Sequence, residues 1–254
     1  MEYAPLSRRR VGAEILIVLG LSLGASAVYS VVSIINRLTR DIPLGEQTAT
    51  LNQSMSTRPV FDLIYQLLSI GFDLVPVALV AFILWQQRRP HLAGLGVDLR
   101  HPARDVGAGL ALAAIIGLPG LLLYLGSRSW GIAVAVQASA LDTHWWTVPI
   151  LVLSALRAGL TEEVVVIGYL FARLPVLGWS RWQIIVGCAL LRGTYHLYQG
   201  FGAFVGNAAM GLLFGWLFAR YGRLVPLIVA HVLIDVAVFV GYPWAAETFP
   251  ALFA

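Results

Sequence analysis

The sequence has no lysine, a single cysteine and few charged residues of either sign. Charged residues make up 12% of its 254 residues, about half the share of a typical soluble domain. Apolar residues make up 59%. This composition excludes an ordinary soluble globular protein. Because the one cysteine, Cys188, lies in an apolar segment, the chain has no disulfide framework and no thiolate metal site.

The basic residues are 17 arginines, and the net charge is +4. They stand at the ends of apolar runs and do not form the contiguous basic surface that tracking of nucleic-acid phosphates requires. We therefore expect no nucleic-acid partner. The arginines are better interpreted as markers of the orientation of membrane spans.

Several apolar runs reach the roughly 20 residues that a helix needs to cross a bilayer. They predict an all-α polytopic transmembrane bundle of about seven spans, forming a single membrane domain over residues 1–254. The first run is too long for a signal-peptide core and lacks a following A-x-A-type site, so we expect it in the mature protein. Residues 128–144 are expected to be a loop. The expected spans are 11–35, 60–85 (ending before Gln86–Pro90), 104–127, 145–173, 181–199, 201–220 and 223–242.

The distribution of arginines predicts a cytoplasmic N-terminus. With that orientation eleven arginines flank the spans on the cytoplasmic side and four on the other side, as the positive-inside rule requires. We expect a multi-pass protein of the bacterial plasma membrane, surrounded by membrane lipid. The cytoplasmic set is Arg8, Arg9, Arg10, Arg88, Arg89, Arg100, Arg104, Arg173, Arg181, Arg220 and Arg223, and the outer set is Arg37, Arg40, Arg58 and Arg128.

Ionisable residues inside the predicted spans gather in the second half of the chain. A charge at mid-bilayer costs a few kcal/mol, so each needs an explanation. Counted at about 1.5 Å per residue from the cytoplasmic arginines, they lie about 12 to 22 Å deep, on three spans. We therefore predict a shared polar site, where Glu162, His196 and His231 meet around a cavity. The full set is Glu162, Glu163, Arg192, His196, His231 and Asp235.

Helical spacing indicates how these side chains are directed. His231 and Asp235 are four residues apart and share one helix face, as do Arg192 and His196. The adjacent Glu162 and Glu163 are about 100° apart around their helix. We therefore expect that both cannot face the centre equally, so that one works on a substrate while its neighbour is structural.

Other interpretations of these charges stay open. Buried ion pairs can simply hold helices together, and carboxylates with histidines can also form the proton relay of a proton-coupled transporter. A transporter is expected to show inverted repeats and broken helices in both halves, but Asp73 is the clearest mid-span charge in the N-terminal half. Arg157 is out of helical phase with the glutamates and is interpreted as a packing partner.

The span at 201–220 carries small residues at the spacing that allows close helix approach, in Gly202-x-x-x-Gly206 and Gly211-x-x-x-Gly215. Asn207, between them, either donates a hydrogen bond to the site or bridges helices. Polar and aromatic residues before this span are expected to belong to an aromatic belt at the outer membrane interface, namely Tyr195, Tyr198 and Gln199.

The order of these motifs resembles the CAAX-protease and bacteriocin-processing family of intramembrane endopeptidases, relatives of the eukaryotic Ras-converting enzyme. The likeness covers residues 145–242, while 1–144 supplies N-terminal spans and loops. Glu162-Glu163-x-x-x-Ile167 matches the family's Glu-Glu-x-x-x-Arg except for the arginine. Arg192-x-x-x-His196 keeps the histidine of Phe-x-x-x-His, the small residues of 202–215 match the third motif, and His231-x-x-x-Asp235 is intact.

The resemblance implies an intramembrane endopeptidase that acts on a membrane-associated protein or peptide. Glu162 is then the base that activates water, His196 its partner, and His231 with Asp235 stabilises the oxyanion. This set requires no cofactor. Two histidines and a glutamate could alternatively hold zinc, but the chain has no H-E-x-x-H motif. The motifs themselves do not imply a prenylated CAAX substrate.

The missing arginine at Ile167 leaves Glu163 without its usual cation. Arg192 stands on the next span at nearly the same expected depth, and the planar fork of its guanidinium suits two carboxylate oxygens. We therefore predict that Arg192 has replaced the family's arginine from a different helix. The alternative is that the site has decayed and the chain is a non-catalytic binding or immunity protein of the same fold.

Overall fold

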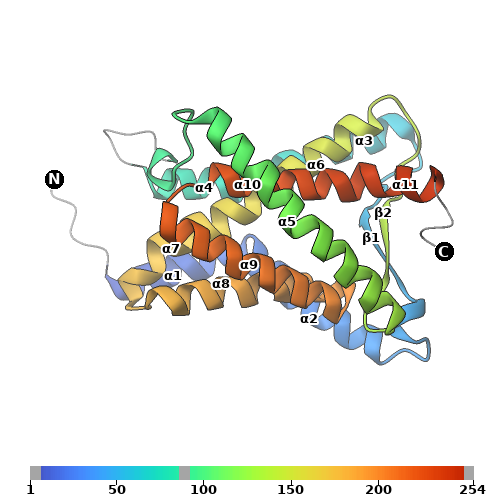
Figure 1. Ribbon diagram of the computed structural model, residues 1–254, viewed down its shortest axis with the longest axis horizontal. Helices are drawn as coiled ribbons and strands as arrows, with labels where there is room; N and C mark the ends of the chain where they lie inside the picture. Colours follow the sequence, from blue (N-terminus) through green and yellow to red (C-terminus); the bar gives the residue numbers. More distant parts are fainter. Residues whose placement is uncertain (1–6, 86–91, 249–254) are drawn as a thin grey trace.

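A computed structural model describes residues 7–85 and 92–248 of the chain. The described residues form an all-α membrane bundle of crossing helices with one small sheet near one end (Figure 1), as predicted. The expected end of the second span at Gln86–Pro90, with Arg88 and Arg89, lies outside the described residues.

In the N-terminal half, the described residues form five α-helices, four of which make two consecutive pairs separated by a short break. The first pair bends by 57° at its break, and the second is broken at Leu74, just before Pro76, whose ring cannot donate a helix hydrogen bond. The bounds are α1 Arg8–Gly20, α2 Leu23–Leu38, α3 Pro59–Asp73, α4 Val75–Ile83 and α5 Pro102–Ser129, with short turns η1 Leu44–Glu46 and η2 Ala93–Leu95.

The C-terminal half contains the remaining described helices. Two of its helices change into π-helix, the wider form with i→i+5 hydrogen bonds. The bounds are α6 Thr147–Glu162, the π-segment η3 Glu163–Tyr169, α7 Leu170–Arg173, η4 Leu174–Leu177, α8 Arg181–Tyr195, η5 Leu197–Gln199, α9 Phe201–Tyr221, α10 Val225–Val236, the π-segment η6 Ala237–Gly241 and α11 Tyr242–Thr248.

Helices occupy all the predicted spans, but fewer than seven are long and apolar enough to cross a bilayer by those criteria alone. Four described helical stretches qualify, or five if the bent pair α1–α2 is one span. The α6–α7 and α8 stretches, which do not qualify, carry the buried Glu162, Glu163 and Arg192. Seven spans therefore stay a prediction. The qualifying stretches are Pro59–Ile83, Pro102–Ser129, Phe201–Tyr221 and Val225–Ala245.

The expectation that 128–144 is entirely a loop was wrong. Strand β2, Ala135–Ser139, pairs in parallel with β1, Thr48–Asn52. Side chains reinforce the pairing, since Asn52 Nδ2 donates to the Ala138 carbonyl over 2.8 Å. The sheet lies beside α11 (Figure 1). A strand whose partner lies so far away in the sequence leaves no local turn signal.

The small residues of α9 allow close contact with two different helices, as predicted. Gly211 packs on Ala189 of α8, where an added Cβ would lie 2.8 Å from the Ala189 Cα atom. At the other end of α9, a Cβ on Gly202 would overlap the Ser127 side chain of α5. The α9 helix therefore fixes α8, which carries Arg192, against the rest of the bundle.

The deepest part of the core surrounds the junction of α6 and η3. Every residue of 161–170 is buried, because α4, α8 and α9 all contact η3. Its apolar side chains, such as Val164 and Ile167, are fully enclosed. The adjacent glutamates, Glu162 and Glu163, are therefore placed in the core rather than at a helix end that faces water.

Candidate active site

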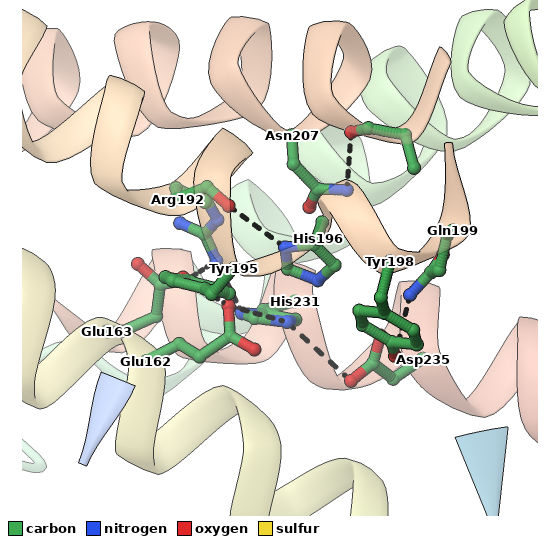
Figure 2. Close-up of polar contacts among 11 residues, drawn as sticks. Glu162, Glu163, Arg192, Tyr195, His196, Tyr198, Gln199, Asn207, His231 and Asp235 are labelled. Atoms are coloured by element: carbon green, nitrogen blue, oxygen red, sulfur yellow. Dashed lines mark hydrogen bonds and ion pairs between the residues drawn. The ribbon is translucent and has the colours of Figure 1, made fainter. Parts of the chain in front are cut away.

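Three helices bring most of the predicted residues into one cluster (Figure 2). Glu162 ends α6 and Glu163 begins η3. Arg192 lies near the end of α8, and His196 caps that helix. His231 comes from the middle of α10. Residues that are far apart in the sequence therefore lie close together, as predicted from their similar depth along the membrane spans.

Arg192 is at the centre of the cluster and is fully buried, with 0% exposure. Its Nη2 atom lies 3.2 Å from Glu162 Oε2 and 2.5 Å from Glu163 Oε1. The predicted pairing of Arg192 with the glutamates is confirmed. The expected fork is not, because one nitrogen makes both contacts, while Nε and Nη1 have no hydrogen bond within the described residues. The guanidinium instead packs against Phe214, 5.3 Å from the ring centroid.

His231 completes the contacts of Glu163. Its Nδ1 atom lies 2.7 Å from Glu163 Oε1 and 2.8 Å from Arg192 Nη2. The two hydrogens on Nη2 can serve the two glutamates, so that Nδ1–H donates to Glu163. The other ring nitrogen, Nε2, then lies 3.9 Å from Glu162 Oε2 and 3.6 Å from Asp235 Oδ2. His231 therefore stands between three carboxylates.

The two glutamates both point toward Arg192, but they differ in their exposure to solvent. Both reach the same nitrogen of Arg192, so the expectation that they cannot face one centre equally was too strict. The Glu163 side chain is sealed at 0% exposure, whereas that of Glu162 is 11% exposed. Glu162 Oε2 accepts from Arg192 and from Tyr195 Oη, while its Oε1 makes no hydrogen bond in the described part of the chain. Oε1 is thus left free to accept a proton.

His196 lies at the end of α8 beside Tyr195, with ring centroids 4.8 Å apart. Its Nδ1 atom is 3.0 Å from the Arg192 carbonyl oxygen. A carbonyl only accepts, so Nδ1 carries the hydrogen and a neutral ring presents Nε2 as an acceptor. Among the described residues, no hydrogen bond joins His196 directly to Glu162 or His231.

The structure brings Asp235 into the cluster through His231, but it does not bond Asn207 to it. The Nδ2 atom of Asn207 donates 3.0 Å to the Ala203 carbonyl of its own helix, α9. That bond neither donates to the site nor bridges two helices, so neither expected role of Asn207 is seen.

Tyr195 is the site residue that sequence reasoning missed. It was expected in an aromatic belt, but it is buried at 5% exposure, and its hydroxyl donates 2.7 Å to Glu162 Oε2. The expectation was wrong because the helix ends at Tyr195 inside the bundle. The signal was available, since Tyr195 follows Arg192 by three residues and therefore lies on the same helix face.

Arg157 lies outside this set of direct contacts, as expected of a packing partner. Its Nη1 atom is 2.9 Å from Asp73 Oδ2 at the end of α3. Nearby, Thr161 Oγ1 donates 3.2 Å to the Asp73 carbonyl. These contacts fasten α3 to the helix that carries the glutamates.

Two of the three site helices change to π-helix at the site itself. The segment η3 begins at Glu163, and η6 begins two residues after Asp235. Single π turns occur often at functional sites, because the wider turn redirects side chains at the expense of regular packing. Their positions mark the same functional region as the charges do.

The described residues of the cluster do not form a ready metal site. Within 7–85 and 92–248, no three His, Cys, Asp or Glu side chains are placed to hold a metal ion. A pocket of about 360 Å³ lies elsewhere, along β2 and beside Tyr242 and Pro243. It does not reach Glu162, so it is not the cavity predicted around Glu162, His196 and His231.

Fold and site together define a multi-pass membrane protein whose core holds a partly accessible glutamate among histidines and an arginine. Residues 144–237 match the family described as type II CAAX prenyl endopeptidase Rce1-like. The match confirms the resemblance seen in the sequence, and the matched segment contains the whole cluster. No curated protein and no solved structure matches the chain.

Proposed function

We propose that the protein is an intramembrane endopeptidase in which Glu162 activates the attacking water. The observation that supports this proposal most directly is that only one of the two carboxylate oxygens of Glu162 accepts hydrogen bonds from its neighbours. Oε2 accepts from Arg192 and Tyr195, while Oε1 makes no hydrogen bond with any described residue and the side chain is 11% exposed. A general base needs this combination of fixed position and open proton-accepting capacity.

In the proposed first step, a water molecule lies between Glu162 Oε1 and the acceptor Nε2 of His196. Glu162 takes the proton of the water as its oxygen bonds to the carbonyl carbon of the peptide, and negative charge develops on the carbonyl oxygen. His231, with a hydrogen on Nε2, donates to that oxygen and stabilises it. Asp235, 3.6 Å from Nε2, acts through His231 by favouring its protonated form.

In the second step, the tetrahedral intermediate collapses and the C–N bond breaks. The proton held on Glu162 passes to the leaving nitrogen, which restores the base. Glu163 and Arg192 keep their relative positions throughout, because the pair anchors both Glu162 and His231. Arg192 thus provides Glu163 with the positive charge that the family's arginine, replaced here by Ile167, would provide.

The proposed substrates are proteins or peptides associated with the membrane, since the base lies within the helical bundle. The proposed location is a bacterial plasma membrane with the N-terminus in the cytoplasm, supported by the arginine distribution. No cofactor takes part in these steps.

The function can be tested with purified protein in lipid vesicles and internally quenched peptides, prenylated and unprenylated. E162Q is expected to lower kcat about 10²- to 10⁴-fold, the usual contribution of a general base. The matched control is E14Q, because Glu14 is another partly buried carboxylate, bonded to Arg173 and Tyr169 rather than to the cluster. Equal cleavage by E162Q and E14Q proteins of similar melting temperature would rule out Glu162 as the base.

Metal chelation separates the glutamate mechanism from the zinc alternative. The expected result is full activity in the presence of a strong chelator, because the proposed base and oxyanion donors are side chains. The same peptide assay provides the measurement. Loss of cleavage that added zinc restores would replace the glutamate mechanism with a metal-dependent one.

A further inference from the structure

The buried hydroxyl of Tyr195 points to a role that the family's motifs do not include. Tyr195 Oη donates to Glu162 Oε2 over 2.7 Å. The same oxygen accepts from Arg192 Nη2 at 3.2 Å. Both donors come from one face of α8, three residues apart. They occupy Oε2, and Oε1 has no hydrogen bond within residues 7–85 and 92–248.

We propose that Tyr195 is a positioning residue that fixes the carboxylate of Glu162, so that Oε1 is the oxygen that receives the proton of water. This inference rests on the proposed function, since it assigns the orientation of its base. Because Tyr195 is buried and its hydroxyl is directed at Glu162 (Figure 2), it acts through Glu162 and not on the substrate.

The physical reason is rotation of the carboxylate. Arg192 presents a single nitrogen to the glutamates, and one donor does not stop the carboxylate of Glu162 from turning Oε1 toward the guanidinium. The second donor, from Tyr195, sets the carboxylate plane and keeps Oε2 on the inner side. A displaced base loses much of its rate advantage, because proton transfer needs hydrogen-bond reach in a defined geometry.

A second tyrosine provides a matched control. Tyr169 is also fully enclosed, and its hydroxyl donates 3.0 Å to the carboxylate of Glu14. Y195F and Y169F therefore each remove the hydroxyl of one tyrosine–glutamate hydrogen bond. A purely structural role for Tyr195 predicts that the two variants behave alike in stability and in activity.

The first test compares the kinetics of the two variants with peptide reporters. Y195F is expected to lower kcat about 10- to 100-fold, the range for losing a hydrogen bond to a charged group, while KM changes less than about twofold because the substrate is not contacted. Y169F is expected to keep the kcat of the unsubstituted protein. An equal kcat for Y195F and Y169F proteins, matched for folded fraction, would overturn the assignment.

The second test does not require activity. Dicyclohexylcarbodiimide, a hydrophobic carbodiimide, modifies carboxyl groups in apolar surroundings, and fragment masses distinguish Glu162 from Glu163. Y195F is expected to increase the labelling rate of Glu162 several-fold, because the hydroxyl that occupies Oε2 is gone, whereas Y169F leaves it unchanged. Equal labelling of Glu162 in both variants would refute the positioning role. Absence of cleavage by the unsubstituted protein would instead refute the proposed function, with the labelling result still deciding the role of Tyr195.

Discussion

At the scale of single residues, Arg192 is a charged side chain that is fully removed from solvent. It is fully buried, and one of its nitrogens contacts two carboxylates and an imidazole. A guanidinium in such a place is tolerated only because the negative charges around it offset the loss of hydration. Removing the cation leaves the glutamates without that compensation.

Arg192→Leu is therefore expected to reduce the free energy of unfolding by about 3–5 kcal/mol, the usual effect of breaking a buried ion pair. Removing both partners in Arg192→Leu with Glu163→Leu is expected to be less damaging, since no sealed carboxylate is left unpaired. Thermal unfolding in detergent measures both variants. A double variant no more stable than R192L would contradict this account of the pair.

The proposed relocation of the family's arginine gives a separate prediction. Arg192→Phe with Ile167→Arg restores the family's arrangement, and it is expected to regain folding and peptide cleavage that R192F alone lacks. The reason is that residue 167 lies four positions after Glu163 on the same helix and can return the cation from that side. If adding the arginine at 167 gives no recovery over R192F, the relocation is wrong.

At the scale of helices, the site depends on how closely α6 and α10 approach. Gly159 lies one turn before the glutamates, and a Cβ there would be 2.7 Å from Val232 Cγ2, beside His231. The absence of a side chain at Gly159 lets the two helices pack closely enough for the 2.7 Å contact between His231 and Glu163.

Gly159→Leu is expected to separate the two helices, to reduce the free energy of unfolding by about 1–3 kcal/mol through overpacking, and to reduce peptide cleavage in the protein that still folds. Gly120→Leu in α5 is the control, because a Cβ at Gly120 meets no atom within 4 Å. Unfolding and cleavage are measured on both variants. Equal behaviour of G159L and G120L would show that this close approach does not matter to the site.

The sequence allowed the helices and most of the polar cluster to be predicted, because apolar runs and arginine ends are local signals. The approach of His231 to Glu162 and the pairing of Arg192 with Glu163 were predicted from depth along the helices. The pairing of β1 with β2 and the π-helix at Glu163 could not be predicted in this way, because they depend on contacts between distant segments. Tyr195 was misplaced because the end of α8 was expected nearer the membrane surface.

At the scale of the whole molecule, the arginines at the helix ends predict the orientation in the membrane. Cys188 is buried at 1% exposure, so the native thiol offers little background in a labelling experiment. The loop before α8 is predicted to be cytoplasmic, and the loop before α3 to lie on the opposite side.

Single substitutions Ser180→Cys and Ser56→Cys place a thiol in each of these loops. In intact cells, a membrane-impermeant maleimide is expected to label the cysteine at 56 and not the one at 180, which becomes labelled only after the cells are opened. The unsubstituted protein reports any contribution from Cys188. Labelling of both positions from the same side would contradict the predicted arrangement of the spans between them.

The central claim is that Glu162 makes this bundle a protease, and its most direct test is a comparison of membrane proteomes. Cells with the unsubstituted protein, E162Q or E14Q at equal levels are analysed for the termini of their membrane proteins. If Glu162 is the base, a defined set of precursors remains uncut in E162Q cells and is cut in the other two. Identical termini in all three strains would contradict it.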